Sequence, residues 1–295
     1  PLADNKENMV GTWSVAANFA NATSVLTGLQ QAVGSQAKIL YARGSNLDAD
    51  SVFEQHAGMF GKSLKRDNRS AEVILQEALA IANQSDVIVA ALGESAEMSG
   101  EASSRSNIEI PKLQQDLLKA LLKTGKPVVL VLFTGRPLAL KWEDANVPAI
   151  LNVWFGGSEA GFAIADVLFG DVNPSGKLSA TFPQNIGQVP IFYNHKNTGR
   201  PLPEGKWFQK FRSNYLDVSN DPLYPFGFGL SYTSFSYSDV ALSSSDLKGN
   251  QTLTASVTVT NTGKTDGKEV VQLYIRDKVG SVTRPVKELK SFQKI

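Results

Sequence analysis

The sequence contains no cysteine and only two histidines, His56 and His195, among its 295 residues. Without cysteine, the chain can form neither a disulfide nor a thiolate nucleophile or thiolate metal site. The two histidines stand far apart in the sequence, so a zinc site built on histidine is not expected. We therefore expect neither a metal nor a cofactor.

Long apolar runs and an excess of one charge are also absent. No run reaches the roughly 18 apolar residues of a membrane-spanning helix, so no membrane segment is predicted. With 29 basic and 28 acidic residues the net charge is +1, and no basic patch argues for a nucleic-acid partner. An α/β phosphate- or nucleotide-binding domain is one alternative for the function. The glycines at 135–137 and 155–157 match no phosphate-binding motif, which counts against it.

The first 200 residues alternate between apolar runs and amphipathic stretches. The apolar runs are short and rich in β-branched residues, as in strands that are buried on both faces. Thr23 is expected to cap the first helix and Ser70 or Arg69 to begin the second. The fold class predicted is α/β, with a mainly parallel sheet flanked by helices. The expected strands lie at residues 38–41, 87–92, 127–133 and 149–154, and the expected helices at 25–33, 70–82, 113–122 and 159–169.

The amino-acid composition changes after residue 170. Glycine, proline and aromatic residues dominate up to about residue 235, which predicts a long irregular segment that wraps a surface. Beyond it, apolar and polar residues alternate, and residues 260–263 (TNTG) are typical of a hairpin turn. We expect a partial all-β sandwich there. The predicted division is residues 1–200 for the α/β domain, 201–235 for the irregular linker and 236–295 for the partial sandwich.

An acidic loop follows the strand at residues 87–92. Glu94, Glu97 and Glu101 stand in this loop, and Arg105 comes just after them. Ligands of open α/β sheets bind beyond the carboxyl ends of the strands, so this loop is the first place to look for chemistry. The alternative is that each glutamate is an ordinary solvated residue, as most glutamates are.

Several long motifs carry a family resemblance. They run in the order GESAEMSGEASSRSNIEIP, GKPVVLVLFTGRPLAL, WFGGSEAGFAIADVLFGDVNPSGKL, YPFGFGLSYTSF and TVTNTGKTDGKEVVQLY. In this order the sequence resembles glycoside hydrolase family 3, over essentially the whole chain. The resemblance implies an N-terminal (β/α)8 barrel, then an α/β sandwich domain, then a fibronectin-III-like domain. This chain would be the second of these and about half of the third.

The resemblance also implies an activity: a retaining β-glucosidase, periplasmic or secreted, that acts on β-glucosides and oligosaccharides. The nucleophile would be an Asp of the barrel, outside this chain. The acid/base would be a glutamate of the acidic loop. We predict Glu101, which precedes Arg105 by four residues, with Glu94 as the second choice. Arg105 is expected to support the loop by pairing with another acid.

Two further expectations complete the interpretation. The chain begins without methionine and ends within an expected strand, so we interpret it as a piece of a longer protein that is inactive by itself. The alternative function is a non-catalytic carbohydrate-binding or scaffold module, in which aromatic residues stack on sugars. Its candidate residues are Trp154, Phe155, Trp207 and Tyr224.

Overall fold

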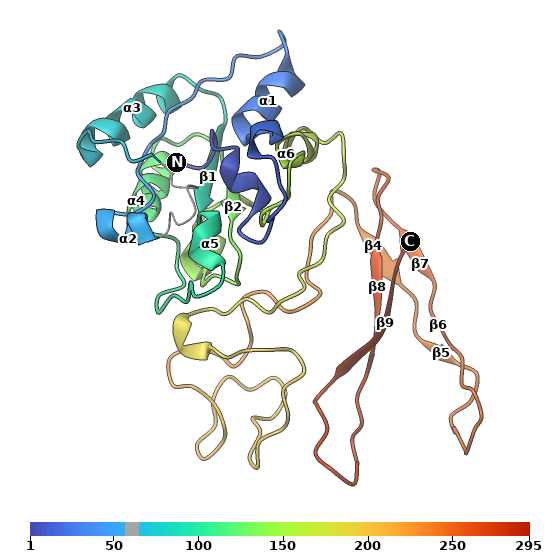
Figure 1. Cartoon of the computed structure of the whole chain (residues 1–295). Coiled ribbons are helices and arrows are strands. Elements are labelled where there is room, and N and C mark those ends of the chain that lie inside the picture. The colour runs from blue at the N-terminus through green and yellow to red at the C-terminus, as the bar shows by residue number, and fades with distance from the viewer. Residues whose placement is uncertain (57–64) are drawn as a thin grey trace.

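A parallel sheet lies at the centre of the first part of the chain (Figure 1). The computed structural model describes residues 1–56 and 65–295. The strands are β1 (Ile88–Gly93), β2 (Val128–Phe133) and β3 (Ala149–Asn152), hydrogen-bonded in that order. Val129 of β2 lies opposite Val89 of β1 and Ala149 of β3. The α/β prediction with a parallel sheet is confirmed.

Helices cover both faces of this sheet. Figure 1 shows α3 and α4 on one side and α1 and α6 on the other. No helix within the described ranges is both long and apolar enough to cross a membrane. The α-helices are α1 (Val25–Val33), α2 (Ser51–His56), α3 (Ala71–Asn83), α4 (Lys112–Leu122), α5 (Lys141–Asn146) and α6 (Ala160–Phe169). The short 3-10 helices are η1 (Glu7–Val10), η2 (Phe19–Asn21), η4 (Ala96–Ser99) and η5 (Ile186–Gln188).

The two faces of β2 build two apolar clusters. Leu130 and Leu132 are buried in a cluster with Leu118 of α4. Val131 and Phe133, which alternate with them, are buried in a second cluster with residues of α1 and α6. Successive side chains of a strand point to opposite faces, so an apolar run of this kind requires cover on both.

The helices α1 and α6 touch through glycine. A Cβ atom on Gly161 would lie 2.3 Å from the carbonyl oxygen of Ser24, and one on Gly28 would lie 2.1 Å from that of Gly161. These distances leave no room for any side chain. The close approach therefore depends on glycine in both helices.

The helix starts match the expected capping chemistry, with one correction. Ser70 caps α3 by accepting a hydrogen bond from the Val73 backbone, as predicted. The cap of α1 is Ser24, whose Oγ accepts from the Thr27 nitrogen at 3.2 Å. The prediction of Thr23 is wrong by one residue. The backbone nitrogen of Thr23 instead donates to the oxygen of Ser158, which places Thr23 in the contact between two loops.

The strand predicted at residues 38–41 does not form. This segment pairs with none of the described strands. The backbone of Leu2 donates to Ala91 of β1 at 3.3 Å, so the first residues of the chain lie along that edge of the sheet. The β1 edge is thus occupied at Ala91 by the first residues of the chain, and the strand prediction for residues 38–41 is wrong.

An irregular segment follows α6, as predicted, and contains only the short η5 (Figure 1). Its two halves are tied together by backbone hydrogen bonds. Leu178 donates to Phe228 and Gly227 donates to Leu178, both at 2.7 Å, and Phe182 and Tyr224 form an isolated antiparallel bridge. These bonds fold the segment back on itself against the α/β part.

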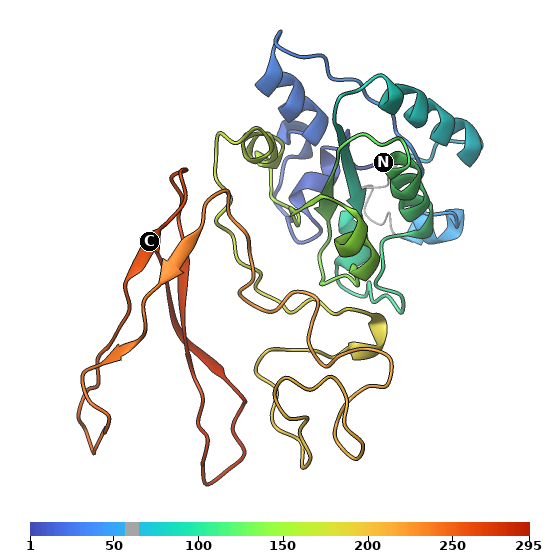
Figure 2. The ribbon, with the colours of Figure 1, turned by 180° about the vertical axis from the view of Figure 1, so that it is seen from behind.

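The last part of the chain is antiparallel. Figure 2 shows its strands beside the α/β part, joined to it by the irregular segment. β4 pairs with β7, β5 with β6 and β8 with β9. The strands are β4 (Phe235–Tyr237), β5 (Ala241–Leu242), β6 (Ala255–Ser256), β7 (Val259–Asn261), β8 (Val270–Ile275) and β9 (Glu288–Lys294).

The hairpin predicted at residues 260–263 does not form, because the strands on either side of this turn do not pair with each other. The turn was expected to join strands on either side of it, yet β7 pairs with β4 and not with β8. The backbone of Thr262 donates to the oxygen of Ser234, which extends the pairing with β4 through the predicted turn. The Asn261 side chain then accepts from the Gly263 nitrogen, so a turn forms there without a hairpin.

Candidate active site

Polar and aromatic residues follow all three parallel strands at the same edge of the sheet. Glu94 comes directly after β1, residues 134–136 come after β2, and Phe155 comes shortly after β3. Because the strands are parallel, their carboxyl ends lie together, and this is the edge at which open α/β sheets bind ligands.

Glu94 is completely buried and is bonded on both carboxylate oxygens. Arg105 Nη1 lies 2.8 Å and Arg136 Nε 3.0 Å from its Oε1. The Thr134 hydroxyl lies 2.9 Å from Oε2, and the Gly135 backbone nitrogen donates to the same oxygen at 3.3 Å. These donors satisfy both carboxylate oxygens of Glu94. Glu94 therefore serves as an anchor for two arginines.

The two arginines hold the acidic loop from inside. Arg136 Nη2 donates to the carbonyl oxygens of Met98 and Ser103, the latter at 2.7 Å. Arg105 Nη2 donates to the oxygen of Glu109 at 3.1 Å. The carbonyls held by Arg136 lie on either side of residues 99–102. This turn is therefore clamped at both of its ends.

Glu101 stands on the clamped turn and is exposed. It follows Gly100 directly after η4, and Ala102 beside it has a positive φ of 57°. The side chain of Glu101 belongs to no ion pair in the part of the chain that the structure describes. The third glutamate of the loop, Glu97, is buried within η4. Of the three, Glu101 alone presents its carboxylate to solvent.

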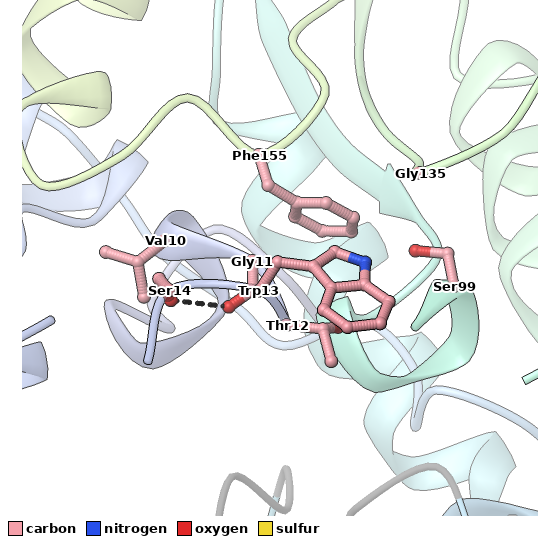
Figure 3. A pocket seen from close by; sticks show the side chains of 8 residues that line it. All are labelled: Val10, Gly11, Thr12, Trp13, Ser14, Ser99, Gly135 and Phe155. Atoms are coloured by element: carbon pink, nitrogen blue, oxygen red, sulfur yellow. Dashed lines mark hydrogen bonds between the residues drawn. The ribbon is translucent and has the colours of Figure 1, made fainter. Parts of the chain in front are cut away.

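A hollow of about 430 Å³ lies beside this turn (Figure 3). We call it the Trp13 hollow. Trp13 is 67% exposed, and Figure 3 shows its indole together with the Phe155 ring and the Ser99 hydroxyl around the opening. The hollow is mostly apolar with a few hydroxyls, as small-molecule sites usually are. Its lining residues are Val10, Gly11, Thr12, Trp13, Ser14, Ser99, Gly135 and Phe155.

The Trp13 hollow and the acidic loop are in direct contact. The Thr12 hydroxyl hydrogen-bonds to the carbonyl oxygen of Ala96, and a Cβ on Gly100 would lie 2.5 Å from Thr12 Cγ2. A Cβ on Gly135 would lie 2.0 Å from Ser99 Oγ. A side chain at Gly100 would require Thr12 to shift, and one at Gly135 would require Ser99 to shift. The residue before Glu101 therefore lies against the wall of the hollow. Nothing in the sequence around Trp13 predicted this, because the contact spans more than eighty residues of chain.

The aromatic residues proposed for sugar stacking do not form one surface. Trp154 and Tyr224 both pack edge-on against Phe182, at ring distances of 5.9 and 6.1 Å. The Tyr224 hydroxyl donates to Asp144 at 2.6 Å. Burial is the larger cause and this hydrogen bond the next, and both raise the pKa of the Tyr224 phenol. Phe155 lines the Trp13 hollow, and Trp207 is exposed on the irregular segment.

The described residues include no group of three or more His, Asp and Glu that could hold a metal ion. His195 is exposed on the irregular segment, where its ring nitrogen lies 3.2 Å from the oxygen of Lys196. The side chain of His56 lies outside what the structure describes.

Comparison with known proteins identifies the family. The sequence profile of the glycosyl hydrolase family 3 C-terminal domain matches residues 1–232, and that of a fibronectin type III-like domain matches residues 269–295. The chain therefore belongs to glycoside hydrolase family 3.

Its relatives include named glycosidases. A periplasmic beta-glucosidase of Salmonella typhimurium is 52% identical over 100% of this chain and 38% of its own length. A beta-xylosidase of Formosa agariphila is 38% identical, over 100% of this chain and 38% of its own length. The crystal structure of a beta-glucosidase from Listeria innocua in complex with gluconolactone has a TM-score of 0.84 at 38% identity, and the match covers 100% of this chain and 37% of that one. The chain thus spans well under half the length of these relatives.

Proposed function

We propose that this chain is the C-terminal part of a retaining β-glucosidase that releases terminal β-linked glucose from β-glucosides and oligosaccharides. The names of the Salmonella and Listeria relatives support the activity, and the 38% coverage of the former supports an N-terminal partner domain, which we propose to be a (β/α)8 barrel. The name of the Salmonella relative also supports a periplasmic or secreted location. The division of this chain at residues 200 and 235 belongs to the same proposal.

Glu101 is proposed as the acid/base. The observation that carries this choice is the contrast between two glutamates of one loop: Glu94 is buried and bonded to two arginines, whereas Glu101 is exposed on the clamped turn. A general acid must reach the glycosidic oxygen within hydrogen-bond distance. Glu94 has no access to a substrate from its buried place, while Glu101 is free to face one. Arg105 and Arg136 position the loop.

The reaction then divides between two parts of one protein. A carboxylate outside this chain, roughly 5 Å from Glu101 in the assembled site, attacks the anomeric carbon. Glu101 gives its proton to the glycosidic oxygen, the bond to the aglycone breaks, and a glycosyl-enzyme ester forms. Glu101, now a carboxylate, takes a proton from water, which attacks the ester and releases glucose. The Trp13 hollow, beside Glu101, is proposed to receive the leaving group.

The leaving-group dependence of hydrolysis tests this assignment in the longer protein that contains these residues. Glu101→Ala should slow an alkyl β-glucoside or a disaccharide by about 10²–10⁴-fold, since these leaving groups need protonation. The same substitution should slow glycosyl-enzyme formation far less when the substrate is an aryl glucoside whose leaving group is an acidic phenol. Glu109→Ala, which removes an exposed carboxylate near the same loop, should leave both classes unchanged.

Two outcomes would overturn the proposal in different ways. If Glu101→Ala slows all substrates equally, the acid/base is another group. If the unaltered protein binds sugars and hydrolyses neither β-glucosides nor β-xylosides, the chain belongs to a carbohydrate-binding or scaffold protein. The xyloside is included because the Formosa relative is named a beta-xylosidase.

A further inference from the structure

A second hollow, of about 500 Å³, is lined by the connection between β8 and β9. We call it the Arg284 hollow. Figure 1 shows that this connection lies apart from the α/β part. Residues 277–284 line it together with Asn197 of the irregular segment. An antiparallel bridge between Lys196 and Pro285 holds the two segments side by side. The hollow is therefore built from two stretches distant in the sequence and is more than the tip of a free hairpin.

Positive charge gathers in the Arg284 hollow without a partner. Lys278 and Arg284 line it, and neither belongs to an ion pair among the residues that the structure describes. Asp277 is the one acidic residue of the lining, and its Oδ1 accepts from the Val279 backbone at 3.2 Å within the loop itself. With Asp277 counted, the lining residues carry a net charge of +1, and this positive charge attracts anions.

Neutral donors accompany the two cations. Asn197, Ser281 and Thr283 are also among the lining residues, and their side chains carry N–H or O–H groups. Arginine presents a planar fork of N–H groups that matches the oxygens of a phosphate, sulfate or carboxylate group. The combination of one arginine, one lysine and three neutral donors has the chemistry of an oxyanion site.

We propose that the Arg284 hollow binds an oxyanion, a phosphate, sulfate or carboxylate group, either free or carried by a carbohydrate. Its volume lies within the range of small-molecule sites and leaves room for more than the anion itself. None of the residues that line the Arg284 hollow belongs to the acidic loop, so the proposal does not depend on whether the chain hydrolyses glucosides. The competing explanation is a solvated loop whose cations are neutralised by water and salt alone.

Calorimetric titration of the longer protein tests the site with three probes: inorganic phosphate, glucose 6-phosphate and glucose. Inorganic phosphate and glucose 6-phosphate should both bind, with an affinity that falls as salt is added. Arg284→Ala and Lys278→Ala should each weaken this binding by about tenfold or more, since each removes a charge-assisted hydrogen bond. Binding of glucose should be the same in all variants. A tighter fit of glucose 6-phosphate than of inorganic phosphate would identify a carbohydrate as the carrier.

The matched control is Lys248→Ala, which removes an exposed cation from the connection between β5 and β6. It should change phosphate binding by less than about twofold. Equal weakening by Lys248→Ala and Arg284→Ala would mean that the anions respond to the overall charge, and would overturn the site. So would the absence of phosphate binding to the unaltered protein. Arg284→Lys keeps the positive charge but loses the planar set of guanidinium N–H groups. Its affinity for phosphate should lie between that of the unaltered protein and that of Arg284→Ala.

Discussion

Arg136 bonds three groups of the candidate site at once: the Glu94 carboxylate and the carbonyl oxygens of Met98 and Ser103. Arg136→Lys keeps the charge, yet a single ammonium cannot reach the same three acceptors. We expect a loss of about 1–3 kcal/mol in the free energy of unfolding. We also expect kcat/KM to fall by about 10²-fold, because a small displacement of Glu101 would misalign the proposed acid.

Thermal melts and steady-state kinetics of the longer protein check this expectation. Arg69→Lys is the control, because Arg69 pairs with Asp67 and Glu77 at an exposed site. It should leave the melting temperature and kcat/KM unchanged. An Arg136→Lys protein that melts early but keeps full kcat/KM would show that the clamp does not set the position of Glu101.

Glu143 of α5 is a buried carboxyl whose charge is unfavourable. Burial first, and the nearby Glu109 carboxylate second, raise the pKa of Glu143 above its usual value of 4.5. The folded protein then holds the proton of Glu143 to a higher pH than the unfolded chain does. The contribution of this residue to stability is therefore fully present below pH 4.5 and is lost as the pH rises through the raised pKa.

Glu143→Gln, which cannot ionise, should for that reason raise the melting temperature at pH 7 and change it little near pH 4. Glu204→Gln on the exposed irregular segment serves as the control and should show no such difference between the two pH values. A Glu143→Gln protein that is less stable than the unaltered one at pH 7 would contradict this prediction.

Individual residues also show where the sequence stops being informative. The spacing of Glu94, Glu101 and Arg105 was enough to predict an acidic loop at the end of a strand. It could not predict that Glu94 would be buried against Arg136, because that contact follows from the pairing of β1 with β2. Contacts between neighbouring strands determine which glutamate is buried and which is exposed. The residues of the acidic loop alone do not predict these contacts. The role of Glu101 remains a prediction.

At the scale of helices and strands, the contact between α1 and α6 gives a stability prediction. Gly161→Ala places a Cβ 2.3 Å from the Ser24 oxygen, so α6 must move away from α1. Overpacking of this kind lowers the free energy of unfolding by about 1–3 kcal/mol. Gly176→Ala is the matched control, because a Cβ there meets nothing within 4 Å and its φ is not positive.

Denaturant unfolding measures both glycine variants. Gly176→Ala should be neutral or slightly stabilising, since it reduces the freedom of the unfolded chain. If Gly161→Ala unfolds at the same midpoint as Gly176→Ala, the two helices do not pack as closely as the structure shows.

Strongly periodic elements were predictable, and weakly periodic ones were not. The apolar run of β2 and the leucine stripe of α4 predicted their elements within a residue or two. The six-residue helices α2 and α5 carry too few apolar positions to show a period, and neither was predicted. The segment at 38–41 reads as a strand by composition alone, but a strand also needs a partner edge, and no local signal reports one.

At the scale of the whole molecule, Asn173 joins the end of the α/β part to the antiparallel strands. Its Oδ1 accepts from Ser231 Oγ at 2.9 Å and from the Tyr232 nitrogen at 2.8 Å, and its Nδ2 donates to the oxygen of Asp266 at 2.9 Å. Asn173→Ala removes all three hydrogen bonds. We expect a loss of about 1–3 kcal/mol and faster amide exchange around residues 231–235.

Amide hydrogen exchange, measured by mass spectrometry on peptides along the chain, checks that expectation. Asn250→Ala, on the exposed connection between β5 and β6, is the control and should change neither stability nor exchange. Unchanged exchange near residue 231 in Asn173→Ala would mean that the junction is held by its other contacts, among them the ion pair of Lys177 with Glu269 at 3.2 Å.

Chemical rescue of Glu101→Ala tests the central claim most directly. In the longer protein, Glu101→Ala should stall after forming the glycosyl-enzyme from an activated aryl β-glucoside, because no base activates the water. Added azide should restore turnover and yield β-glucosyl azide, with retention at the anomeric carbon. Glu94→Ala should lose activity through disorder of the clamp and gain nothing from azide. Rescue of Glu94→Ala, with Glu101→Ala still active on poor leaving groups, would contradict the account and assign the acid to Glu94.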